Sequence, residues 1–207
     1  MTGSEENQTE AHPEARNAGL ADWDTLVLGL GNLLYADEGF GVRAVEALQD
    51  AWELPGHVRI MDGGTQGLFL TPFVSSAKSL LIFDAIDFGL EPGELRVITG
   101  DDVPRFMGVK KVSMHQTSFQ EVLATADLAG NLPERLALVG VQPDTFDDYG
   151  GSLRPVVRAR LDEAVQAGIA VLAEWGIEAR PLADGEASDS TAHEAITLER
   201  YERKPQE

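Results

Sequence analysis

The sequence predicts an α/β protein, built as a three-layer α/β/α sandwich around a mostly parallel twisted sheet of about five strands. The alternation of two kinds of segment favours this class. Short apolar runs typical of buried parallel strands, such as TLVLGL (25–30), alternate with stretches whose apolar residues recur at helical spacing. In such sheets ligands bind beyond the carboxyl ends of the strands, so acids at those ends are the first candidates for chemistry.

The predicted strands are the apolar or alternating segments 25–30, 57–62, 79–86, 93–99 and 134–141. The segment 93–99 follows the turn pair Pro92–Gly93 and alternates apolar and polar residues, which predicts an antiparallel strand.

Helices are predicted between the strands, at 37–52, from near His115 to residue 128, and from Ser152 to about Trp175. Ser152 is the expected N-cap of the last helix, and Pro155 falls in its first turn, where proline is tolerated. A helical turn is expected to end before or at Pro72.

The composition indicates one folded domain, over residues 23–180. Residues 1–22 are predicted to be a disordered leader and 181–207 an acidic, mostly disordered tail. The 16 basic and 35 acidic residues give a net charge of −19, which argues against a nucleic-acid or anionic membrane partner. No apolar run is long enough to span a membrane and no signal peptide is seen, so a cytoplasmic protein is expected.

Several chemistries are excluded by residue type. The chain has no cysteine, which rules out disulfides, thiolate zinc sites, iron–sulfur clusters and cysteine nucleophiles. It has neither a G-x-S-x-G serine elbow nor a phosphate-binding G-x-x-x-x-G-K-[ST] loop.

The stretch 29-GLGNLLYADEGFGVR-43 begins like a dinucleotide-binding loop. The G-x-G-x-x-G fingerprint needs glycine or alanine where this chain has Leu34, and the helix is expected to start well after the glycines. Asp62, at the end of the second strand, would be the ribose-binding acid of such a site. The acid fits this interpretation and the loop does not.

A metal site is the other interpretation. Glu38 follows the first strand, Asp84 ends the third, and His115 lies near a helix start, so all three can converge at one sheet edge. Two carboxylates and an imidazole suit a divalent ion such as nickel or zinc. Each residue also has a plain structural interpretation, because acids cap helices and turns and a loop histidine is commonly solvated.

The motifs GNLLYADEGFG, MDGGT, LLIFDAIDFG, SMHQTSFQEVL and LVGVQP occur in this order. In this respect the chain, from about residue 24 to 178, resembles the nickel–iron hydrogenase maturation endopeptidases, and most closely those that serve uptake-type, membrane-bound hydrogenases. The resemblance implies a hydrolase that removes the C-terminal extension of the hydrogenase large-subunit precursor after nickel insertion. The precursor is the implied partner, and its small maturation chaperone is a second implied partner.

The resemblance also implies roles for particular residues. Glu38 of ADEG, Asp84 of FDAI and His115 of SMHQ would bind the nickel that the precursor carries, and no other cofactor is expected. Glu38, Asp84 and Asp62 are the catalytic candidates, since amide hydrolysis without a serine or cysteine nucleophile needs a Lewis acid or a carboxylate. The neighbouring Asp37 is expected to cap the helix. The alternatives are a non-catalytic nickel-binding chaperone and a dinucleotide-dependent oxidoreductase.

Overall fold

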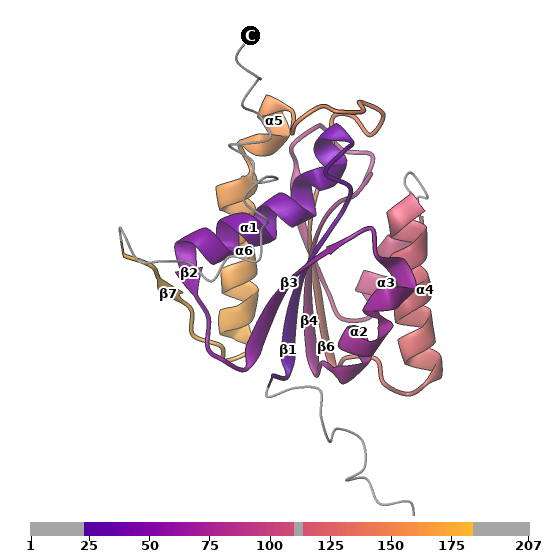
Figure 1. The fold of residues 1–207 in the computed structure, drawn as a ribbon, viewed down its shortest axis with the longest axis vertical. Helices are drawn as coiled ribbons and strands as arrows, with labels where there is room; N and C mark the ends of the chain where they lie inside the picture. Colours follow the sequence, from indigo (N-terminus) through magenta and orange to yellow (C-terminus); the bar gives the residue numbers. More distant parts are fainter. Residues whose placement is uncertain (1–22, 110–113, 184–207) are drawn as a thin grey trace, which may run out of the picture.

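The protein is described here from a computed structural model, which places residues 23–109 and 114–183. Five strands form its main sheet, in the order β3-β1-β4-β6-β5 (Figure 1). Their bounds are Thr25–Leu30 (β1), Val58–Gly64 (β3), Ser79–Ala85 (β4), Leu95–Thr99 (β5) and Arg135–Val141 (β6). All neighbours in this sheet pair in parallel except β5 and β6, which are antiparallel. The predicted α/β class and the five predicted strands are thus confirmed, and so is the antiparallel orientation predicted for segment 93–99, which is β5.

Helices cover both faces of the sheet (Figure 1). One layer holds α1 (Phe40–Ala51), α5 (Pro155–Arg158) and α6 (Leu161–Glu174), and the other holds α2 (Thr71–Ser76), α3 (Asp102–Val109) and α4 (Met114–Leu128). The central strand β4 is buried along its whole length, and its side chains alternate between the two cores. A strand that is buried on both faces must be apolar on both, which is why its sequence reads as a continuous apolar run.

The first predicted helix is shorter than expected. A 3-10 helix, η2 (Ala36–Gly39), precedes α1, so that α1 itself begins at Phe40. Trp52 has an extended backbone and lies in β2 (Trp52–Glu53), which pairs with β7 (Arg180–Pro181). The predicted domain boundary after residue 180 therefore falls inside β7, whereas the predicted leader and residues 184–207 of the predicted tail lie outside the described chain.

The last predicted helix is two helices. Ser152 lies before α5 and is not its N-cap, because the residue at that position is Arg154, whose backbone is extended. The helix is interrupted after α5, and α6 begins after Arg160, which lies at its N-cap. The prediction of Pro155 in a first helical turn is confirmed.

The helical turn expected before Pro72 is the 3-10 helix η3 (Gly67–Leu70), so that expectation is confirmed. The helix α2 that follows was not predicted; Pro72 lies in its first turn, where its missing N–H has no helical partner to lose. Helix α3 was not predicted, and within the described chain no helix is long and apolar enough to cross a membrane.

The carboxyl ends of β1, β4 and β6 gather at one edge, at the top of Figure 1, together with η2 and the connection 142–154. Helix α4 also starts at this edge, because it leads back to Arg135, the first residue of β6, which pairs with Ser79 at the opposite edge. This carboxyl edge holds the candidate site.

Candidate functional site

Glu38 lies in η2, directly beyond β1, and is only 8% exposed. Its backbone N–H donates to the carbonyl of Tyr35 at 2.9 Å. A Cβ on Gly31 would overlap the Glu38 carbonyl oxygen, and Gly31 has a φ of +131°, in the half of conformational space that favours glycine. Glycine at this position therefore lets the chain fold back so that Glu38 sits against the end of β1.

The start of α1 also packs closely against the strand ends, at Gly41. A Cβ on Gly41 would overlap the carbonyl oxygens of Leu30 and Phe83, at the ends of β1 and β4. The glycines of GLGN and GFG thus bring a helix and a turn into contact with strand ends, and η2 contacts β4 directly. This differs from a dinucleotide-binding loop, because α1 begins at Phe40, nine residues after Gly31, and offers no helix N-terminus to a phosphate held at the glycines.

Asp84 is the second-last residue of β4 and is fully buried. Its Oδ1 accepts a hydrogen bond of 2.8 Å from the backbone N–H of Ala85. In β4 Leu80 and Ile82 face the core beneath α2, α3 and α4, so the alternation of a strand turns Asp84 toward the same layer. A buried carboxylate is costly unless something holds it, which makes Asp84 unusual for a central strand.

Asp62 lies near the end of β3 and is half-buried, with Oδ1 buried and without a hydrogen-bond partner among the described residues. Burial raises the pKa of the Asp62 carboxyl above its ordinary value of 3.8. The backbone N–H of Gly64 and the guanidinium of Arg43 oppose that shift. A carboxyl with a raised pKa at the ligand-binding edge of a sheet is a candidate acid or base.

A buried ion pair lies beside Asp62 and was not predicted. Arg43 and Glu46, both on α1, are joined by contacts of 2.8 and 3.1 Å from Nη1 to the two Glu46 oxygens. Burial raises the pKa of Glu46, Arg43 lowers it, and the charge of Asp62 raises it further. The Arg43 guanidinium thus lowers the pKa of two acids, Glu46 and Asp62. The signal was present in the sequence, as a base and an acid three residues apart on an apolar helix.

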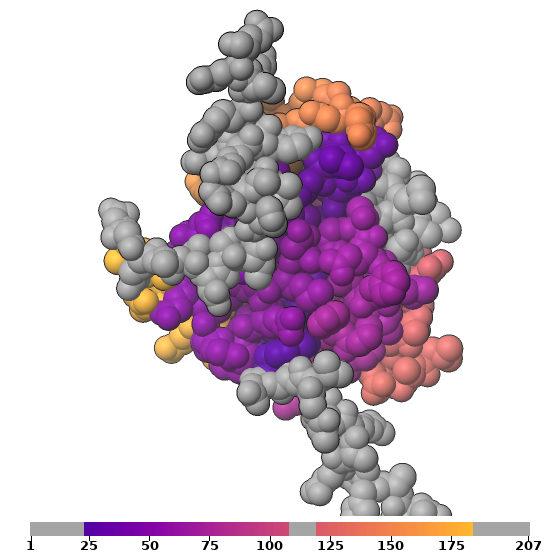
Figure 2. Space-filling view, viewed as in Figure 1, coloured from indigo at the N-terminus to yellow at the C-terminus, as the bar shows by residue number. Residues whose placement is uncertain are grey.

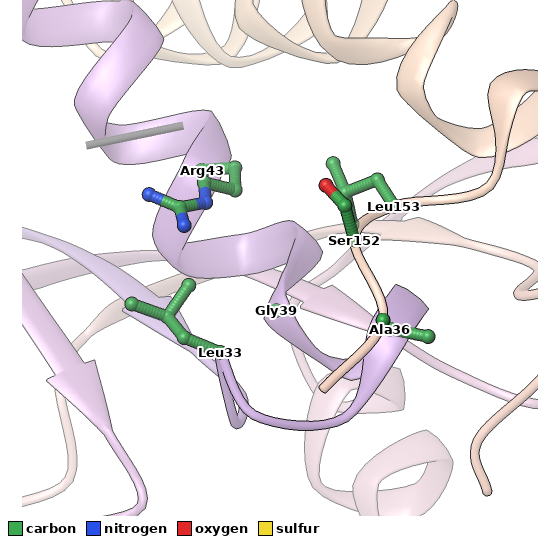
Figure 3. Close-up of a pocket in the computed structure, with 7 residues that line it drawn as sticks. Leu33, Ala36, Gly39, Arg43, Ser152 and Leu153 are labelled. Carbon is green, nitrogen blue, oxygen red and sulfur yellow. The ribbon is translucent and has the colours of Figure 1, made fainter. Parts of the chain in front are cut away.

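Figure 3 shows a small pocket on one side of which Arg43 lies. Arg43 lines it together with Leu33, Ala36 and Gly39 of the turn before α1, and Gly151, Ser152 and Leu153 of a distant connection form its far wall. The segment after β6 therefore lies alongside the turn that carries Glu38.

The prediction that Asp37 caps the helix was wrong, since neither η2 nor α1 has a side-chain cap. The Asp37 carboxylate is fully buried and accepts three backbone N–H groups from the connection after β6: Asp144 at 2.9 Å, Thr145 at 3.2 Å and Arg154 at 2.7 Å. Figure 2 shows the surface of this connection, in orange, against that of the residues after β1, in indigo. Asp37 joins two segments that are more than 100 residues apart.

His115 is the second residue of α4, and the structure describes its backbone but not its side chain. Its place at the start of α4 puts it at the carboxyl edge, in the layer that Asp84 faces. Among the side chains that the structure describes, no three His, Cys, Asp or Glu residues form a group able to hold a metal ion. Because His115 is not among them, the predicted triad of Glu38, Asp84 and His115 stays a prediction.

Comparison with known proteins gives consistent matches. The family model for hydrogenase maturation proteases matches residues 42–171. A hydrogenase expression/formation protein HupD of Rhizobium leguminosarum is 51% identical over 179 residues, which cover 86% of this chain and 89% of that protein. The hydrogenase 2 maturation protease of Escherichia coli is 40% identical over 157 residues, 75% of this chain and 94% of the relative.

Solved structures agree with the sequence matches. The hydrogenase maturating endopeptidase HybD of Escherichia coli superimposes with a TM-score of 0.74 at 38% identity, covering 78% of this chain and 99% of HybD. The family-model match, the sequence identity with these relatives and the shared fold lead to one conclusion: this chain belongs to the hydrogenase maturation protease family.

Proposed function

We propose that this protein is a cytoplasmic endopeptidase that removes the C-terminal extension of a hydrogenase large-subunit precursor, and that it acts only on the nickel-loaded form. The observation that carries the proposal is the burial of two carboxylates, those of Glu38 and Asp84, at the carboxyl edge of the sheet in a chain of this family. The fold keeps these acids in place with close backbone contacts, as a binding site requires.

The nickel in this proposal belongs to the substrate. Carboxylate oxygens from Glu38 and Asp84 and an imidazole nitrogen from His115 form a donor set that suits nickel, and they would reach the ion on the precursor. The alternation of β4 turns Asp84 toward the layer in which α4 begins at Met114, which supports the inclusion of His115. Recognition of the ion would tell the enzyme that insertion is complete.

Asp62 has the properties of the proton-handling group. A general acid–base group works best when its pKa lies near the operating pH, and burial shifts the pKa of Asp62 in that direction. In this proposal Asp62 takes a proton from water and gives it to the leaving amine. The guanidinium of Arg43, which also pairs with Glu46, lies beside Asp62 and opposes the upward shift of its pKa.

The test is incubation of the purified protein with nickel-loaded and nickel-free precursor, followed by measurement of the precursor mass. We expect the loaded form alone to lose the mass of its extension. Equal cleavage of both forms would contradict the nickel check. Binding of the loaded precursor without any change of mass would favour the non-catalytic chaperone.

The ligand assignment is tested with Glu38→Gln, which removes a negative charge and preserves shape. The matched control is Glu121→Gln, the same change at an exposed position of α4. We expect Glu38→Gln to abolish cleavage and the control to cleave normally. Normal processing by Glu38→Gln would remove Glu38 from the site.

A further inference from the structure

The hydrogen bonds of Asp37 have the geometry of a clasp. Oδ2 accepts the consecutive N–H groups of Asp144 and Thr145, and Oδ1 accepts the N–H of Arg154. The carboxylate therefore holds both ends of the connection 144–154 with a single side chain. We call this set of three hydrogen bonds the Asp37 clasp.

Two further contacts reinforce the Asp37 clasp on its outer side. The N–H of Gly150 donates to the carbonyl of Leu34 at 2.7 Å, and Tyr35 and Tyr149 form an isolated antiparallel bridge. Their rings meet edge to face with centroids 5.4 Å apart, although Tyr149 is 70% exposed. The middle of the connection is thus tied to the chain just before η2.

The Asp37 clasp lies next to Glu38 and also holds a strained residue. Ala36 has a φ of +36°, which a residue with a Cβ adopts only when its surroundings impose it. Glu38 follows Asp37 directly, and its carbonyl oxygen is pressed against Gly31 on the other side. The backbone of Glu38 is therefore held between the Asp37 clasp and the end of β1.

We propose that Asp37 is the positioning residue for Glu38: by holding the connection 144–154 across η2, its buried carboxylate fixes the direction in which Glu38 presents its own carboxylate. Asp37 makes no contact with substrate in this proposal. The catalytic consequence rests on the proposed function of Glu38, whereas the structural consequence does not.

The variant is Asp37→Asn. An asparagine keeps the shape but places an NH₂ group against at least one of the three N–H donors, so the clasp cannot close completely. The matched control is Asp144→Asn, which makes the same charge change in the same connection, at an exposed side chain whose backbone N–H remains available. Both variants would be made in the full chain.

The first measurement is backbone amide hydrogen exchange by NMR, which needs no precursor. We expect exchange at Thr145, Arg154 and Glu38 to accelerate at least about tenfold in Asp37→Asn, with the amides of β1 and β4 unchanged, because only the local opening becomes easier. Asp144→Asn should exchange like the wild type. Unchanged exchange at Glu38 in Asp37→Asn would overturn the proposal, whether or not the protein cleaves the precursor.

The second measurement is precursor cleavage. We expect kcat to fall by roughly 10- to 100-fold in Asp37→Asn while KM is unchanged, since a small misplacement of a reacting group affects the chemical step and leaves docking intact. A variant with faster exchange at Glu38 and a normal kcat would overturn the catalytic consequence. If the wild type itself cleaves nothing, the proposed function fails, and the exchange data still decide the role of Asp37.

A second variant covers the case in which Asp37→Asn does not fold. Tyr149→Ala removes the exposed ring from the outer side of the clasp and leaves Asp37 in place. We expect the same amides to exchange faster, by a smaller factor, and kcat to fall in the same direction. Wild-type exchange at Glu38 in Tyr149→Ala would then contradict the proposal.

Discussion

Replacement of Gly31 by alanine tests how the fold holds Glu38. The new Cβ would overlap the Glu38 carbonyl oxygen, and the residue would have to keep a φ of +131°. Positive φ costs about 1–2 kcal/mol for a residue with a Cβ. Overpacking adds about 1–3 kcal/mol, at the upper end because the obstacle is backbone and cannot rotate away. The free energy of unfolding should therefore fall by about 2–5 kcal/mol.

The control is Gly130→Ala, which separates the two costs. Gly130 also has a positive φ, of +67°, but a Cβ there would meet nothing within 4 Å. It should lose only the conformational cost of about 1–2 kcal/mol. With an m-value of roughly 2 kcal/mol per M, the urea midpoint should fall by roughly 0.5–1 M for Gly130→Ala and by roughly 1–2.5 M for Gly31→Ala.

The same two variants should differ in kcat for precursor cleavage. Gly31→Ala forces η2 away from β1 and should lower kcat, whereas Gly130 lies in the connection from α4 to β6, at the opposite edge, and should leave kcat unchanged. Equal loss of stability in the two variants would show that Gly31 has no steric role against Glu38. Normal cleavage by a destabilised Gly31→Ala would show that Glu38 does not need this support.

Two further predictions concern the charges beside the site. The pKa of Asp62 is raised by folding, so the native state holds its proton more tightly than the unfolded chain. The wild type should lose stability as pH rises from about 3.8 through the raised pKa, and Asp62→Asn should lose less, because Glu46 still contributes. Urea titrations at several pH values measure this, and parallel pH profiles would refute it. Arg43→Met should cost about 3–5 kcal/mol, because it leaves Glu46 buried beside Asp62 without a cation. Glu46→Gln should cost less, since Arg43 keeps the attraction of Asp62, and an equal or larger loss in that variant would contradict the one-cation, two-acid arrangement.

The five strands of the main sheet could be predicted from the sequence because each one carries its own signal, whereas the two-residue strands β2 and β7 could not. The apolar run of β4 and the alternation of β5 depend on which faces are buried, and burial leaves a local pattern in residue type. The helices were predicted less well. Ser152 was assigned as an N-cap by local rules for helix ends, but tertiary contacts decide there, since Arg154 is held in an extended conformation just before α5, where Asp37 accepts its N–H.

The order of motifs in the sequence also indicated the family, and the matches to known proteins confirm it. Glu38 and Asp84 were selected by their position after strands, and the structure places both, buried, at the carboxyl edge. The raised pKa of Asp62 and its link to Arg43 could not be predicted, because a pKa depends on burial and on charges brought close by folding.

Asp37 and Glu38 show where the two kinds of information divide. By itself the sequence determined that this stretch carries two adjacent acids after a buried strand, within a run of motifs that resembles a protease family. Only the tertiary structure decided what Asp37 does, because its three donors lie 107, 108 and 117 residues further along the chain. A local pattern records which face of an element is buried, but it holds no information about which distant backbone will need an acceptor.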